Sequence, residues 1–162
     1  MANSYLTRTP SSAGNRRKFT FSAWLKLSQS ASTTYIFQAG DNGNNDIQFS
    51  FQNDNKFYIK SFSGGSTGFD LATYAKYRDS SGWYHFVVAI DTEQSTASNR
   101  AKIYVNGELI TALVDTVYCS QNTDLEISNT VSHNIGASVN NSQTFDGYMS
   151  HVAFVDGQQL AP

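Results

Sequence analysis

The amino-acid sequence predicts an all-β protein in which two antiparallel sheets pack face to face as a jelly-roll sandwich. Three observations support this fold class. Apolar and polar residues alternate with a period of two over much of the chain, turn-forming residues separate the alternating runs, and no window of a dozen residues has the apolar spacing of an amphipathic helix. Ten or more short strands are expected, and so many strands without crossover helices must pack sheet on sheet.

The clearest strand is predicted from Lys18 to Leu27, where Phe and Leu side chains alternate with Thr, Ser and Lys. Two further alternating runs, 47–52 and 57–60, are separated by Asn53, Asp54 and Asn55, which predicts a tight hairpin. These runs place a half-buried strand early in the chain and a strand pair directly after it.

The second half of the chain gives three more predictions. Residues 83–90 are apolar on both faces, which favours a central strand covered on both sides, and Asn106-Gly107 between alternating runs predicts a two-residue hairpin. Residues 145–155 predict a long strand that ends in a turn at Asp156 and Gly157. In that strand, uninterrupted alternation would place Tyr148 and Phe154 on the same face.

Length and composition favour one domain over residues 1–162, since single cores commonly hold about 100–200 residues. The net charge is −2, and the one basic cluster, Arg16-Arg17-Lys18, has the pattern of a solvated junction between a loop and a strand. Nucleic acid is therefore not an expected partner, because it requires a concentrated basic surface. No signal peptide and no apolar run long enough to span a membrane is found, so membrane insertion is not expected.

Single residues with reactive side chains are interpreted as structural. Cys119 is the single cysteine, which excludes an intrachain disulfide, and it is expected to be a small buried residue. The histidines, His85, His133 and His151, lack metal-ligand spacing, and His85 is expected to be a hydrogen-bonded core residue.

Four sequence blocks resemble the laminin G-like branch of the concanavalin A-like superfamily. They are Phe21-Ser22-Ala23-Trp24-Leu25-Lys26, Gly82-Trp83-Tyr84-His85-Phe86-Val87-Val88, Lys102-Ile103-Tyr104-Val105-Asn106-Gly107 and Phe145-Asp146-Gly147-Tyr148. Their order and spacing match over nearly the whole chain. The resemblance implies the two-sheet jelly roll that the alternation predicts.

The opening Tyr5-Leu6-Thr7-Arg8-Thr9-Pro10, together with the closing Asp146-Gly147-Tyr148 and Phe154-Val155-Asp156-Gly157, is similar to modules of structural and tail-fibre proteins of marine bacteriophages. This narrower resemblance implies a virion component, assembled in the host cytoplasm. The expected partner is a bacterial surface glycan bound by a non-catalytic adhesion module. The alternative is a structural module, such as a capsid decoration or a fibre-joining domain, that contacts another virion protein and forms homo-oligomers in the virion.

Catalysis is not expected, because superfamily members that hydrolyse glycans carry alternating acids on one strand. The closest pattern here, Asp124-Leu125-Glu126, would place two acids on one strand face but lacks a third. The predicted function is therefore binding.

Related lectin domains hold calcium through loop oxygens, and the loop 41–46 is the best candidate for such a site. It contains Asp41 and Asp46 together with three asparagines. The alternative is a polar hairpin loop without an ion. No cofactor is required by the sequence, and calcium is the one cofactor considered.

Sugar recognition combines aromatic rings with polar groups that pair hydroxyls. Aromatic residues on polar-facing or loop-proximal positions, together with the amides of the loop 41–46, form the candidate set, although packing on the sheet explains each of them equally well. The candidates are Trp24, Tyr35, Tyr58, Tyr74, Asn42, Asn44 and Asn45.

Overall fold

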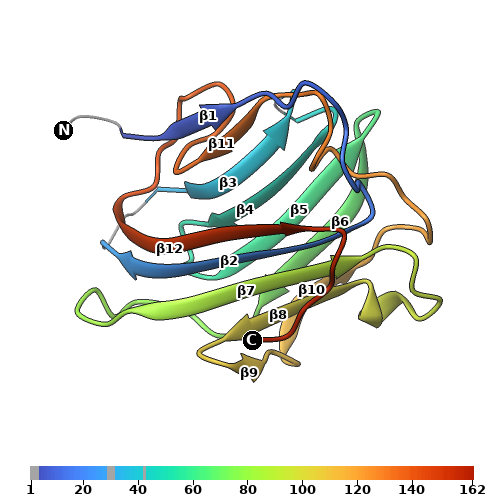
Figure 1. The fold of residues 1–162 in the computed structure, drawn as a ribbon. Helices are drawn as coiled ribbons and strands as arrows, with labels where there is room; N and C mark the ends of the chain where they lie inside the picture. The colour runs from blue at the N-terminus through green and yellow to red at the C-terminus, as the bar shows by residue number, and fades with distance from the viewer. Residues whose placement is uncertain (1–3, 29–31, 42) are drawn as a thin grey trace.

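The computed structural model describes residues 4–28, 32–41 and 43–162 as two stacked antiparallel sheets (Figure 1). The larger sheet has the strand order β1-β11-β3-β4-β5-β6-β10, and the smaller has the order β12-β2-β7-β8-β9. The strands of the larger sheet are β1 (Leu6–Arg8), β11 (His133–Ile135), β3 (Thr34–Gly40), β4 (Asp46–Phe51), β5 (Phe57–Ser63), β6 (Ser66–Thr73) and β10 (Leu113–Val117). Those of the smaller sheet are β12 (Gly147–Asp156), β2 (Lys18–Leu27), β7 (Tyr84–Asp91), β8 (Ala101–Val105) and β9 (Glu108–Leu109). The predicted all-β sandwich is confirmed.

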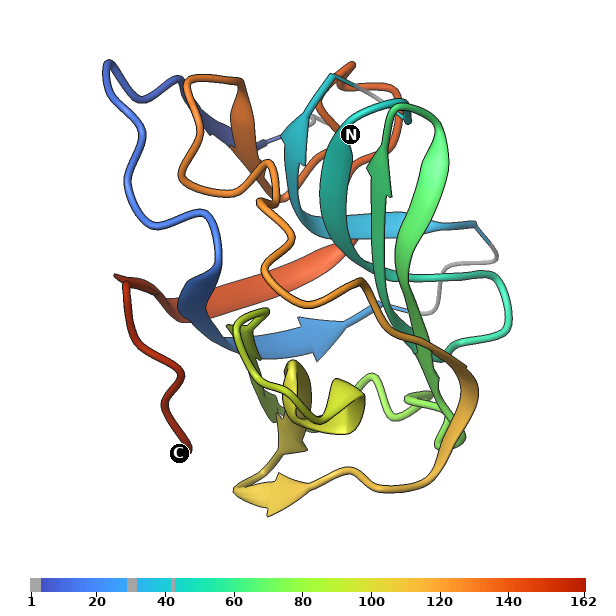
Figure 2. The ribbon, with the colours of Figure 1, turned by 90° about the vertical axis from the view of Figure 1, so that its right-hand side faces the viewer.

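The turned view shows the sandwich from its side, with β4, β5 and β6 in one layer and β2 and β12 in the other (Figure 2). One short 3₁₀ helix, η1 (Ala97–Asn99), interrupts the β structure between β7 and β8. In the described part of the chain, no helix is long and apolar enough to cross a membrane.

The core lies between the sheets and is rich in phenylalanine. Phe49 of β4 packs against Phe21 and Phe37 at ring-centroid distances of 5.5 Å and against Phe19 at 6.5 Å. Offset and tilted ring pairs of this kind stabilise a core beyond the effect of buried area alone. Alternation therefore works as predicted: the inward residues of β2 and β4 meet, and their outward neighbours form the two outer faces.

The predicted hairpin at Asn106-Gly107 is confirmed between β8 and β9, and both residues have positive φ values, 52° and 87°. That combination fits the two-residue turn for which Asn-Gly is the preferred sequence. Cys119 is buried as predicted, and its burial raises the pKa of the thiol.

β7 is a central strand between β2 and β8, as its sequence predicted. Its outer face is partly covered by the chain's own C-terminal segment, which crosses β2 and β7 in Figure 1. Leu160 N–H donates to Thr20 Oγ1 at 2.8 Å, and the Gln159 side chain donates to the backbone carbonyls of Asn99 at 2.9 Å and Ala89 at 3.3 Å.

Two strand-level predictions are wrong. His85 is on the outer face of the smaller sheet and not in the core, because its position in β7 alternates with the buried Phe86. β12 does not alternate without interruption: a bulge between Ser150 and Ala153, where His151 has a φ of 50°, shifts the register by one residue. Phe154 therefore faces the core side, where its ring lies 5.7 Å from Phe19, whereas Tyr148 faces outward.

Candidate functional site

The candidate site is the outer face of the seven-stranded sheet. In β4, Ile47, Phe49 and Phe51 point into the core, so Asp46, Gln48 and Ser50 point outward. These three polar residues are nevertheless buried, with Asp46 and Ser50 each only 1% exposed. Most buried polar side chains in proteins have a hydrogen-bond partner.

Residues that are paired across neighbouring strands form rows on this face. One row, here called the tyrosine row, runs across three strands as Tyr35, Ser50 and Tyr58. Ser50 lies between the two tyrosines, which are two strands apart and therefore roughly 9.5 Å from each other at the backbone. The Ser50 hydroxyl is buried and has no hydrogen-bond partner among the described residues.

The adjacent row, here called the polar row, runs as Gln38, Gln48, Lys60 and Asp70 across β3, β4, β5 and β6. Lys60 Nζ lies 3.3 Å from the Asp70 carboxylate and 5.1 Å from the centre of the Tyr58 ring. Lys60 therefore links the two rows, through an ion pair within one row and a cation–π contact with the other.

One end of the polar row is closed by the loop between β11 and β12. Gln38 Nε2 donates to Asp46 at 2.6 Å, and the backbone N–H of Val139 donates to Gln38 Oε1 at 2.8 Å. Asn134, beside Gln38 on β11, donates to the Ser138 carbonyl at 2.8 Å and to Asn141 Oδ1 at 2.9 Å. These bonds hold the loop over β11 and β3, so the open part of the face lies over β4, β5 and β6.

Burial changes the acid–base properties of three groups on this face. It raises the pKa of the Asp46 carboxyl, an effect that the hydrogen bond from Gln38 only partly offsets. It also raises the pKa of Tyr35, with a contribution from the charge of Asp46. The pKa of Tyr58 is raised to about 12, first by desolvation and then by the hydrogen bond that its hydroxyl donates to Asp54 at 3.1 Å. Both tyrosines are therefore neutral hydroxyls at physiological pH.

The structure brings two of the predicted sugar-contacting residues together and separates the others. Tyr35 and Tyr58 share the tyrosine row, but Trp24 lies on the outer face of the opposite sheet, where its ring stacks on His85 at 5.0 Å. Tyr74 is 70% exposed and directly follows β6.

Asn44 and Asn45 of the loop 41–46 belong to neither row. Asn44 is exposed, and Asn45 donates from its side chain to Asp41 at 3.1 Å, while Asn42 lies outside the described residues.

The calcium prediction concerns two carboxylates with different partners. Asp41 accepts the side-chain amide N–H of Asn45 at 3.1 Å and its backbone N–H at 2.7 Å, and these hydrogen bonds lower its pKa, whereas Asp46 accepts from Gln38 on the outer face. Within the described residues, no group of three or more His, Cys, Asp or Glu side chains is arranged to hold a metal ion. Calcium binding at Asp41 and Asp46 therefore stays a prediction.

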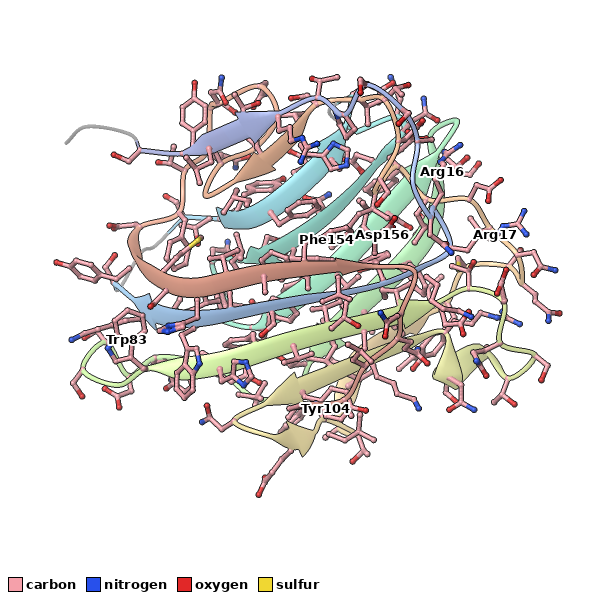
Figure 3. The ribbon with its side chains drawn as sticks, viewed as in Figure 1. Arg16, Arg17, Trp83, Tyr104, Phe154 and Asp156 are labelled. Carbon is pink, nitrogen blue, oxygen red and sulfur yellow. The ribbon has the colours of Figure 1, made fainter. Side chains whose placement is uncertain are left out.

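The acidic pair at Asp124 and Glu126 is in a loop and not on a strand, contrary to the expectation from its spacing. Glu126 pairs with Arg16 at 3.1 Å and Asp124 with Arg17 at 2.6 Å. Arg16 and Arg17 (Figure 3) thus connect the junction before β2 to the loop that precedes β11, whereas Lys18 pairs with Asp91 and Glu93.

Sequence reasoning missed Gln48, Ser50, Lys60 and Asp70. Alternation already placed Gln48 and Ser50 opposite the apolar residues of the run 47–52, and Lys60 opposite Phe57 and Ile59. The missing information was which strands are neighbours, because only the register assembles these residues into rows.

The strand order, the phenylalanine core and the polar outer face together define a jelly-roll sandwich of the lectin and glucanase type. The model of the Concanavalin A-like lectin/glucanases superfamily matches residues 1–159, and the chain belongs to this superfamily. A search of curated proteins finds no match.

Solved structures share the fold at low identity. Domain 4 of an extracellular GH43 arabinanase from Geobacillus stearothermophilus, in complex with arabinotriose, is similar with a TM-score of 0.67 and 19% identity over 90% of this chain and 64% of that one. The CBM40 domain of Ruminococcus gnavus IT-sialidase, bound to α2,3-sialyllactose, gives 0.60 and 15% over 97% and 92%. A heptameric SAP-like pentraxin from Limulus polyphemus gives 0.61 and 15% over 93% and 68%.

Proposed function

We propose that this protein is a carbohydrate-binding module whose site is the open part of the outer face of the seven-stranded sheet. The observation that carries the proposal is the adjacency of the tyrosine row and the polar row on one rigid surface. Glycan sites combine aromatic rings, which contact the apolar face of a sugar, with fixed polar groups that pair its hydroxyls. Two similar domains were solved with sugars bound, which supports the same class of ligand here.

Tyr35 is the ring best placed to contact a ligand, because it is partly exposed whereas Tyr58 is buried. In the next row, the partly exposed Lys60 and Asp70, and the 8% of Gln48 that is exposed, would then pair sugar hydroxyls as donors and acceptors. A ligand that contacts the Tyr35 ring also removes that ring from water. We therefore expect a change in the Tyr35 environment when the site is filled.

The test is a glycan array followed by calorimetry on the best ligand. Tyr35→Ala and Gln48→Ala are expected to weaken binding by about tenfold or more, which corresponds to about 1.4 kcal/mol. Tyr74→Ala is the matched control, because Tyr74 is exposed outside both rows. An array without signal, or equal losses in all three variants, would contradict the proposal. The array is run with and without calcium, and a signal that requires calcium would support the ion site at Asp41 and Asp46.

We propose binding without hydrolysis, because both acids of the Asp124-Leu125-Glu126 pattern are held in ion pairs with arginines. Incubating the best glycan with the protein is expected to release no reducing ends. Product formation that Glu126→Gln abolishes would show instead that the protein is an enzyme.

The proposed setting is a bacteriophage virion, where the module would attach the particle to a bacterial surface glycan. The support for this setting is the sequence similarity of residues 5–10, 146–148 and 154–157 to tail-fibre modules. The second candidate is a structural virion module that joins protein subunits. Light scattering after size-exclusion chromatography separates them: a monomer that binds glycans favours adhesion, and a stable oligomer without glycan binding favours assembly.

A further inference from the structure

The outer face of the five-stranded sheet is covered at one end and open at the other. At the covered end, the C-terminal segment bonds to Thr20 and to the backbone of β7. At the open end, three large aromatic side chains are exposed: Tyr148 is 68% exposed, Trp83 42% and Trp24 41%. Exposed aromatic groups clustered on a soluble protein commonly mark a binding surface. We call this open end the aromatic end.

Lys26 lies at the centre of the aromatic end. Tyr148 of β12 is paired directly with Lys26, and the pairing of Leu25 with Tyr84 places Trp83, the preceding residue, on the other side of Lys26. Neighbouring strands are about 4.8 Å apart, so each aromatic residue is one strand away from the lysine. Figure 3 shows Trp83 at this end of the sheet, beyond the start of β7.

The neighbouring Trp24 is held in place before any ligand binds. Its ring stacks on His85 at a centroid distance of 5.0 Å and an interplanar angle of 18°, and the His85 ring in turn contacts Ser22 Oγ at 2.8 Å through Nε2. A fixed aromatic ring loses little conformational entropy on binding, which favours recognition of a ligand with an apolar surface.

The charge of Lys26 is available. Lys18, Lys56 and Lys60 form ion pairs with carboxylates within 3.3 Å, whereas Lys26 forms no ion pair with any of the described residues. Asp79, whose pKa responds to the charge of Lys26, is engaged by Ser81. It accepts hydrogen bonds from the Ser81 hydroxyl at 2.6 Å and from the Ser81 backbone N–H at 2.8 Å, and these lower its pKa more than Lys26 does.

We infer that the aromatic end is a second binding site, for a carboxylate-bearing sugar such as a uronic or sialic acid residue. The ammonium group of Lys26 would pair the carboxylate, and the rings of Tyr148 and Trp83 would contact the apolar face of the sugar. The seven-stranded sheet offers the opposite electrostatic setting, because its Lys60 is already paired with Asp70 and its exposed Asp115 adds negative charge. The aromatic end of the five-stranded sheet thus selects an acidic sugar, and the outer face of the seven-stranded sheet selects a neutral one.

The chain contains two tryptophans, and both belong to the aromatic end, so their indole N–H resonances report on this site alone. The probes are glucuronate, sialic acid and, as the neutral match, glucose. Glucuronate or sialic acid is expected to shift the Trp83 and Trp24 resonances, and glucose is not. Lys26→Gln is expected to weaken acidic-sugar binding by about tenfold, and raising the salt from about 50 to about 300 mM should weaken it as well.

The control variants separate this site from the one on the other sheet. Lys60→Gln and Tyr35→Ala are expected to leave the indole shifts unchanged, and the unfolding midpoint of Lys26→Gln should match that of the native protein. The inference is overturned if neither acid shifts the indole resonances, if glucose shifts them equally, or if Lys26→Gln binds as tightly as the native protein. Indole shifts produced only by an acidic peptide overturn it too, because they would identify a protein-binding surface. Each result is independent of whether Tyr35 binds glycans.

Discussion

Replacing Asp46 with asparagine should make the protein more stable near neutral pH. The carboxylate is 1% exposed, one oxygen accepts a 2.6 Å hydrogen bond from Gln38, and the other has no partner of good geometry among the described residues. Burial raises the pKa of Asp46 above its ordinary value of 3.8. Ionised Asp46 therefore costs folding free energy, and asparagine keeps an acceptor for Gln38 without the charge.

The pH dependence follows from the direction of this shift. Because the pKa of Asp46 is higher in the folded than in the unfolded state, the cost is absent below about pH 3.8 and grows as the pH rises through the folded-state value. A buried polar atom without a partner costs about 1 to 3 kcal/mol, and the asparagine amide retains part of that cost. The expected gain is thus about 1 kcal/mol near pH 7, or about 2 to 4 °C in Tm.

Urea denaturation over a pH series measures the effect, with Asp54→Asn as the control of opposite sign. Burial opposes ionisation of Asp54, but hydrogen bonds from Lys56 and Tyr58 outweigh it and lower its pKa. Asp54 therefore contributes stability above its unfolded pKa that is lost as the pH falls, so Asp54→Asn should destabilise the protein near pH 7. A less stable Asp46→Asn variant at pH 7, or a difference that does not vary with pH, would refute the reasoning.

Two further predictions test β12 by thermal unfolding. Phe154→Ala should lower the free energy of unfolding by about 2 kcal/mol, because the Phe154 ring contacts Phe19 but is 42% exposed. This is roughly half the loss for a fully buried phenylalanine. Tyr148→Ala should lower it by less than about 0.5 kcal/mol. Equal costs would show that the bulge does not separate the two faces. Gly147→Ala should lower the free energy of unfolding by about 2 kcal/mol or more, because Gly147 has a φ of 153° and an added Cβ would overlap a carbonyl oxygen of β2. Gly64 has a φ of 56° and open space around it, so Gly64→Ala should lower it by about 1 kcal/mol. A Gly147→Ala variant as stable as the Gly64→Ala variant would contradict the close approach of β2 to Gly147.

The parts of the fold that depend on local patterns were predictable from the sequence. The strand over Lys18–Leu27 and the hairpin at Asn106-Gly107 follow from alternation and from the positive φ that asparagine and glycine tolerate. The bulge in β12 was not predictable, because it requires His151 at positive φ, a conformation that its sequence does not signal.

Only part of the candidate site was predictable from the sequence. Alternation identifies Tyr58 and Trp24 as outward-facing but cannot say to which sheet each belongs. Only the register of β3, β4 and β5 places Ser50 between Tyr35 and Tyr58, and it depends on a bulge between Tyr35 and Phe37. The pairing of Asp124 and Glu126 with arginines more than 100 positions earlier was also hidden, because those contacts depend on the tertiary fold.

The bulge in β12 also affects how neighbouring molecules meet. β12 is the last strand of its sheet, and an edge of this kind can pair with a strand of another molecule. At Ser150–Ala153 the ladder changes register, so the ten-residue edge is divided into two short runs of different alignment. A neighbouring chain can extend hydrogen bonds along one run but not across both. We therefore expect that many copies can be crowded on one surface without their sheets joining into aggregates.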